Sequence, residues 1–226
     1  MPFDAVILTG GRSSRLGFTA KSEFLVGQQS LLERTLDAAS AARRIVIVGP
    51  APIPGEREAR LPAAVAPSSV LRAREDPPFT GPAAGIAAGL AALAADAAAP
   101  VDATLVLACD MPGIALAVPV LMDGFRDNPN SDGVLAIDAD GRLQPLAAVF
   151  RTSSLASAIA ASERSGSLAA LPMFRLLDGL RLVPIGVPDG ATADVDSWDD
   201  AQRLGARAPE LAAAPELGTP GGEPHE

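Results

Sequence analysis

The chain has 226 residues, of which 48% are hydrophobic and 20% charged, and its formal net charge is −9. This length suits one domain, or one domain with a tail, and the apolar content is typical of a globular protein. The acidic balance, with a pI of about 4.6, argues against a nucleic-acid partner, because such proteins usually present a basic surface.

Strands and helices alternate along the chain. We expect strands at residues 3–9, 44–48, 70–74, 104–109, 133–137, 145–150 and 180–185. We expect helices at residues 30–42, 82–98, 118–126, 153–163, 167–177 and 197–204. This alternation predicts an α/β domain with a mostly parallel sheet. We assign residues 1–206 to that domain and predict that residues 207–226, rich in Ala, Pro, Gly and Glu, form a disordered tail.

Several classes of protein are disfavoured by what the sequence lacks. Its one cysteine, Cys109, cannot form an internal disulfide, which fits a reducing compartment. Its one histidine, His225, leaves little room for histidine catalysis or histidine metal sites. We see no signal peptide and no uncharged apolar run of the roughly 18 residues that a membrane helix needs. We therefore expect a cytoplasmic protein without a membrane partner.

The loop after the first expected strand opposes the acidic balance of the chain. Residues 8–21 read LTGGRSSRLGFTAK and hold no acid. They include two adjacent glycines and three cations, Gly10, Gly11, Arg12, Arg15 and Lys21. Ligands of open parallel sheets bind at the carboxyl ends of strands, and Gly-rich backbone can cradle phosphates there. The loop indicates an anionic ligand such as a nucleotide; the alternative is an ordinary solvated turn with incidental arginines.

Two further stretches fit a nucleotide site. The apolar run LVLACDMP, residues 105–112, ends in Asp110, where a carboxylate is well placed to hold Mg²⁺ against phosphate oxygens. The alternative is a turn or helix-capping aspartate. The stretch GPAAGIAAGL, residues 81–90, begins a helix whose N–H groups could receive a base or ribose edge. Close packing of small residues on the sheet is the alternative there.

The sequence resembles the molybdenum cofactor guanylyltransferases of the MobA type, within the nucleotidyltransferases of Rossmann-like fold. Five blocks carry the resemblance in the same order: LTGGRSSRLGFTAK, DPPFTGPAAGIAAGL, ACDMPGI, GRLQPLAAVFR and DVDSWDDAQRL. The resemblance extends over residues 5–204. The resemblance implies a three-layer fold with helices on both faces of the sheet.

The resemblance also implies a reaction, in which a terminal phosphate of molybdenum-bound molybdopterin attacks the α-phosphorus of Mg²⁺-GTP and pyrophosphate leaves. It assigns catalysis to Arg15, Lys21 and Asp110, with Asp110 also holding Mg²⁺. It assigns nucleotide binding to Leu8, Thr9, Gly10, Gly11, Gly17 and Lys21, with Asp76 and Gly81 near the guanosine and Gln144 on the molybdopterin side. A transient molybdoenzyme or chaperone partner would suit the handover of a labile product.

Several alternatives stay open. Asp194 is a candidate second metal ligand, as is Asp196, and the alternative for both is an acidic turn before the last helix. The glycine pair favours GTP, but CTP or a sugar phosphate would use the same chemistry. Ala20 replaces an acid common in the family, and no Asn follows the second strand. These departures leave room for a non-catalytic nucleotide-binding or partner-binding module.

Overall fold

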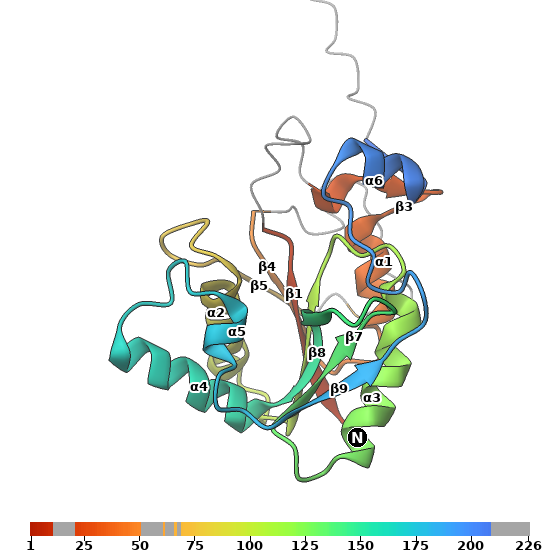
Figure 1. Cartoon of the computed structure of the whole chain (residues 1–226). Coiled ribbons are helices and arrows are strands. Elements are labelled where there is room, and N and C mark those ends of the chain that lie inside the picture. Colours follow the sequence, from red (N-terminus) through yellow and green to blue (C-terminus); the bar gives the residue numbers. More distant parts are fainter. Residues whose placement is uncertain (11–20, 51–60, 62–65, 67–68, 209–226) are drawn as a thin grey trace, which may run out of the picture.

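The computed structural model describes residues 1–10, 21–50, 61, 66 and 69–208. A seven-stranded sheet forms its centre, in the order β5-β4-β1-β6-β8-β7-β9 (Figure 1). The strands are β1 Phe3–Leu8, β4 Ile45–Val48, β5 Val70–Ala73, β6 Ala103–Ala108, β7 Gly133–Ile137, β8 Leu143–Arg151 and β9 Leu182–Gly186. Six strands run parallel to one another and β8 runs antiparallel between β6 and β7. The expected mostly parallel α/β sheet is confirmed.

Helices cover both faces of this sheet (Figure 1). One face carries α1 Leu31–Ala38 and α3 Ala117–Asp127, and the other carries α2 Pro82–Ala95, α4 Thr152–Ser165 and α5 Met173–Leu176. The central strands are buried on both sides: Ile7 belongs to the core under α1 and α3, and Val6 to the core under α2 and α4. A strand buried on both faces must be apolar throughout, which explains the continuous runs read in the sequence.

A small lobe stands beside one end of the main sheet and joins residues 21–30 to the last described residues, 198–208. It contains the strands β2 Leu25–Val26, β3 Gln29–Ser30 and β10 Ala206–Arg207, the helix α6 Trp198–Arg203 and the 3₁₀ turn η2 Lys21–Glu23. Phe24 is fully buried at its centre. The ring of Trp198, which is half exposed, lies against Phe24 with 5.5 Å between ring centroids.

Two expectations differ from the structure. The helix predicted over 167–177 is wrong in extent: only Met173–Leu176 is helical, because Pro172 disfavours helical backbone at the residue before it and becomes the N-cap. The first two residues of the predicted tail belong to the lobe: Arg207 pairs with Leu25 in β10, and Ala208 packs against the cluster that contains Phe24. Residues 209–226, the rest of that predicted tail, lie outside the described residues.

The helix α2 packs closely on the sheet through its glycines. A Cβ on Gly89 would lie 2.6 Å from Cγ1 of Val6, and one on Gly85 would lie 3.1 Å from Cδ2 of Leu8. The small-residue packing considered for this stretch is therefore present. None of the helices in the described part of the chain combines the length and hydrophobicity that a membrane span requires.

Candidate active site

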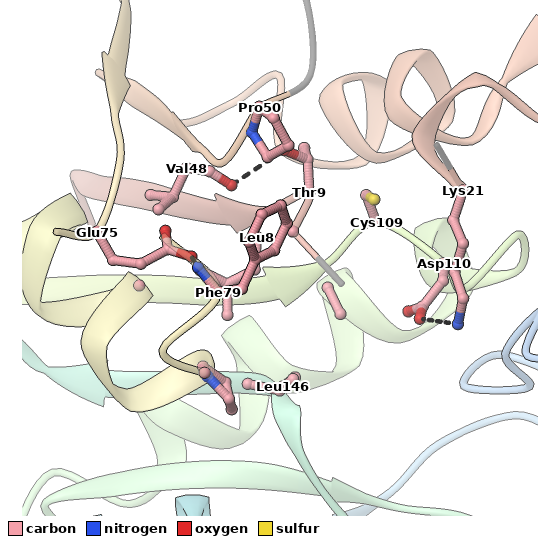
Figure 2. A pocket seen from close by; sticks show the side chains of 15 residues that line it. Leu8, Thr9, Lys21, Val48, Pro50, Glu75, Phe79, Cys109, Asp110 and Leu146 are labelled. Atoms are coloured by element: carbon pink, nitrogen blue, oxygen red, sulfur yellow. Dashed lines mark hydrogen bonds and ion pairs between the residues drawn. The ribbon is translucent and has the colours of Figure 1, made fainter. Parts of the chain in front are cut away.

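A cleft of about 290 Å³ opens at the carboxyl ends of β1, β4 and β6 (Figure 2). The chain passes from β1 to β4 and β5 on one side and then crosses to β6 on the other, so the cleft lies where the winding reverses. The lining residues are Leu8, Thr9, Gly10, Lys21, Val48, Pro50, Glu75, Phe79, Gly81, Pro82, Gly85, Ala108, Cys109, Asp110 and Leu146. The cleft lies where the sheet topology predicts that a ligand binds.

Backbone contacts hold the start of the first loop against β4. The Thr9 N–H and hydroxyl both donate to the Val48 carbonyl, at 2.9 and 3.0 Å. Gly49 follows with φ +128°, and a Cβ there would lie 2.7 Å from the Thr9 hydroxyl and 2.9 Å from the Gly10 nitrogen. Only glycine allows the two loops to approach this closely.

Lys21 joins two acidic segments at one end of the cleft. Its ammonium lies 3.3 Å from Oδ2 of Asp110 and also pairs with Oδ1 of Asp196 (Figure 2 shows the first pair). The backbone supports this arrangement, because the N–H of Val195 donates to the Asp110 carbonyl at 2.9 Å. A cation from the first loop and carboxylates from the end of β6 and the approach to α6 thus converge.

The pKa values of this cluster reflect its crowding. Burial is the largest influence on Lys21 and lowers its pKa, but the hydrogen bond to Asp196 and the charges of Asp110 and Asp196 together raise it above its usual value. Burial, and then the charges of Asp196 and Asp110, raise the pKa of Asp194. Lys21 therefore stays charged, and three carboxylates share one small region.

Asp110 and Asp196 are two carboxylates that could hold a divalent cation together with oxygens of a substrate. No group of three or more Asp, Glu, His or Cys residues within the described ranges is arranged to hold a metal by itself. Mg²⁺ is typically held by one or two carboxylates together with phosphate oxygens. Two carboxylate oxygens that contact the same ammonium fit such a cation, delivered with a phosphate-bearing ligand.

The opposite wall of the cleft differs from the sequence prediction. Glu75, and not Asp76, lines it, and Oε1 of Glu75 accepts a hydrogen bond from the Phe79 N–H at 2.9 Å. Asp76 lines a second hollow between α2 and the segment that follows α4. Glu75 lines both hollows and Asp76 lines only the second, and composition alone does not say which of two neighbouring acids faces a ligand.

The other predicted site residues divide into three groups. Leu8, Thr9, Gly10, Lys21, Gly81 and Asp110 come together in the cleft. Gln144 does not line it: its amide donates to Oδ2 of Asp138 at 3.1 Å, while Leu146 from the same strand reaches the cleft. Gly11, Arg15 and Gly17 lie outside the described residues. Cys109 is buried and its pKa is raised by that burial, as suits a packing residue rather than a nucleophile.

Sequence comparison identifies the family of this chain. The family model for the MobA-like NTP transferase domain matches residues 5–176. The chain belongs to this family of nucleotidyltransferases. The family match includes the loop that begins at Leu8, Lys21, the wall at Glu75 and Phe79, and the strand end at Asp110. A search of curated proteins found no significant match.

Solved structures share the fold of this nucleotidyltransferase at low sequence identity. Molybdopterin-guanine dinucleotide biosynthesis protein A from Archaeoglobus fulgidus is 19% identical, with a TM-score of 0.61 over 89% of this chain and 96% of that one. The 2-C-methyl-D-erythritol 4-phosphate cytidylyltransferase from Thermus thermophilus is 20% identical, with a TM-score of 0.61 over 91% and 98%. Rv0371c from Mycobacterium tuberculosis, in complex with manganese, is 18% identical, with a TM-score of 0.59 over 90% and 98%.

Proposed function

We propose that this nucleotidyltransferase transfers GMP from Mg²⁺-GTP to the terminal phosphate of molybdenum-bound molybdopterin, releasing pyrophosphate and making a guanine dinucleotide cofactor. The observation that carries the proposal is the convergence of Lys21 and Asp110 at the carboxyl ends of β1 and β6. An ammonium and a carboxylate at this position suit a phosphate chain and its counter-ion. The order of the motifs around them supports the guanylyl branch.

The reaction needs positioning and charge neutralisation more than a protein nucleophile. An oxygen of the acceptor phosphate forms a bond to the α-phosphorus, and the bond from that phosphorus to the bridging oxygen of pyrophosphate breaks. Lys21, whose side chain is only 16% exposed, would offset negative charge on the leaving group. Lys21 and the Thr9–Gly10 backbone line the same cleft and together would hold the phosphates at the rim of the sheet.

Asp110 and Asp196 would hold Mg²⁺, with Asp194 as the alternative second carboxylate. Bound Mg²⁺ would neutralise phosphate charge and orient the α-phosphate. Manganese in the structure of Rv0371c, a protein of the same fold, is consistent with this role. When phosphates and metal enter, Lys21 would exchange its two carboxylate partners for phosphate oxygens, because both kinds of partner offer the same charge-assisted hydrogen bonds.

A cytidylyltransferase is the second candidate, since an enzyme of that activity shares the fold to the same degree. The Gly10-Gly11 pair and the GRLQPL block favour the guanylyl reaction by resemblance. A cytoplasmic location, and a transient molybdoenzyme or chaperone that receives the product, complete the proposal.

Calorimetric titration of GTP, CTP and ATP, each with and without Mg²⁺, tests the proposal. We expect a preference for Mg²⁺-GTP, followed by pyrophosphate release when molybdopterin is added. A preference for CTP would keep the chemistry and change the product. Binding without any Mg²⁺-dependent turnover would favour the non-catalytic module instead.

Variants of Asp110 and Lys21 separate their roles. Asp110→Asn should remove at least about 100-fold of the Mg²⁺-dependent rate, a loss typical of a missing charge-stabilising group. Lys21→Met should weaken nucleotide binding and lower the rate together. Circular dichroism of both variants should match the parent, because neither side chain lies in the main core. Normal Mg²⁺-dependent turnover by Asp110→Asn would refute the metal assignment.

A further inference from the structure

Phe79 presents an aromatic side chain to the cleft. It is 48% exposed, and among the described residues that line the cleft it is the one aromatic residue. Figure 2 shows Phe79 with Glu75 on one side of the cleft, with Lys21 and Asp110 on the other. A half-exposed phenyl ring at the mouth of a cleft offers a flat apolar face to a ligand that enters it.

The backbone of Phe79 is held in an unfavourable conformation by specific contacts. Its φ is +62°, in the left-handed region that bulky residues seldom adopt. The Glu75 carboxylate binds the Phe79 N–H. The hydroxyl of the next residue, Thr80, donates to the Pro77 carbonyl at 3.0 Å. The backbone carbonyl of Thr80 accepts a hydrogen bond from the Ala170 N–H at 2.6 Å. Strain of this kind persists where surrounding contacts enforce it, and it clusters at ligand-binding positions.

The two ends of the cleft differ in chemistry. Lys21 and Asp110 make one end charged. Near Phe79 the lining is mostly apolar, with Leu8, Val48 and Leu146 among its members. The Glu75 carboxylate also lines this side, where it accepts the hydrogen bond from the Phe79 N–H. A ligand that fits both ends carries phosphates at one end and a flat, mostly apolar ring at the other. Nucleoside triphosphates have this construction.

We propose that Phe79 stacks on the nucleobase of the bound nucleotide and favours a purine over a pyrimidine. The inference rests on the proposed nucleotide-transfer function and adds a specificity residue to it. A purine offers two fused rings to the phenyl face, whereas a pyrimidine offers one. Because contacts hold the backbone of Phe79 before the ligand arrives, stacking costs little backbone entropy at that residue.

Calorimetry with two ligands isolates the base from the phosphates. The ligands are Mg²⁺-GTP and Mg²⁺-tripolyphosphate, which has the charge but no base. Phe79→Ala should weaken GTP binding about tenfold, the size of effect that loss of one base–aromatic stack produces, and leave tripolyphosphate binding unchanged. Phe79→Trp should keep GTP affinity within about twofold of the parent, because indole also stacks on bases. CTP should lose less affinity than GTP in Phe79→Ala.

Two controls separate the ring from exposure and from backbone strain. Phe174→Ala removes an equally exposed phenylalanine, 55% exposed on α5 and outside the cleft, and should change neither affinity. Phe79→Gly relieves the left-handed strain, so it should raise the melting temperature above that of Phe79→Ala while binding GTP equally poorly.

The outcomes distinguish this inference from the function on which it rests. If the parent binds no nucleoside triphosphate, both fail. If the parent binds Mg²⁺-GTP and Phe79→Ala binds it equally well, the stacking role alone is overturned. Equal losses for GTP and tripolyphosphate in Phe79→Ala would also overturn it, because the defect would then lie in the shape of the cleft.

Discussion

Asp132 lies where β7 begins, at the end of the sheet opposite the cleft, and binds residues of two neighbouring elements. The Arg181 N–H and Nε donate to its Oδ2 at 2.9 and 3.1 Å, and the Ser154 hydroxyl donates to its Oδ1 at 2.8 Å. These contacts, first among them the Arg181 backbone N–H, lower the pKa of Asp132 from 3.8 to about 2. One carboxylate thereby joins the starts of β7, β9 and α4.

A lowered pKa makes the contribution of Asp132 to stability depend on pH. The contribution is full above the ordinary pKa of 3.8 and is lost as pH falls toward the folded value of about 2. Asp132→Asn should therefore cost about 1–2 kcal/mol of unfolding free energy at pH 7, by weakening charged hydrogen bonds. Urea unfolding of both proteins at several pH values should show this gap narrowing below about pH 4. A gap of constant size would contradict the assignment.

At the same scale, the site residues that belong to sequence motifs were predictable, and those in the loop after β5 were not. Asp110 and Lys21 were found because the end of a buried strand and a Gly-rich loop must meet at one edge of a parallel sheet. Glu75 and Phe79 were missed because their direction depends on a loop backbone held by Ala170, far along the chain. No sequence pattern predicts a positive φ at a phenylalanine.

Among the elements, α2 shows why glycine stands inside a helix. Gly89 lets the helix approach β1 so closely that a Cβ would lie 2.6 Å from Val6 Cγ1 and 3.2 Å from Val48 Cγ2. An alanine would gain about 1 kcal/mol in helix propensity, but the contact distance leaves no room for its methyl group. Packing on the sheet therefore outweighs propensity at this position.

The substitution Gly89→Ala should destabilise the protein by about 1–3 kcal/mol, the usual cost of overpacking a core. In a Val6→Ala background the same change should cost clearly less, because the clashing methyl groups are gone. Chemical denaturation of the four proteins in this double-mutant cycle measures the coupling. Additive effects would show that the helix moves away from the sheet instead of straining Val6.

Long elements were predicted from their patterns and short ones were not. Buried strands such as β4, with the sequence IVIV, are continuous apolar runs. The pairs Leu25–Val26, Gln29–Ser30 and Ala206–Arg207 are too short for any periodicity, and they form strands only because Phe24 brings them together. The antiparallel direction of β8 depends on which strands become neighbours, which local patterns do not encode.

At the scale of the whole molecule, the small lobe couples the last described residues to the candidate site. Ala206 pairs with Val26, and both pack in the cluster around Phe24, three residues after Lys21. The lobe has its own core, separate from the two cores of the main sheet. Loss of packing in the lobe should therefore alter the position of Lys21 without unfolding the main sheet.

Two truncated chains test this coupling. A chain that ends at Gly205 loses β10, whereas a chain that ends at Ala208 keeps it, and both lack the same residues beyond 208. We expect amide hydrogen exchange in residues 21–30 to be faster in the shorter chain, with exchange in β1 and β6 the same in both. Equal exchange in residues 21–30 would show that β10 does not hold the lobe.

The lobe can be completed only late in synthesis. A ribosome releases Lys21 and Phe24 early, but their partners Asp196, Val195 and Ala206 near the end of the chain. All seven strands of the main sheet lie before residue 187, so the sheet can form while Lys21 still lacks its second carboxylate. The nascent protein thus acquires its framework first and its complete charge cluster last. A chain cut short by stalled translation would be folded in the centre and incomplete at the cleft.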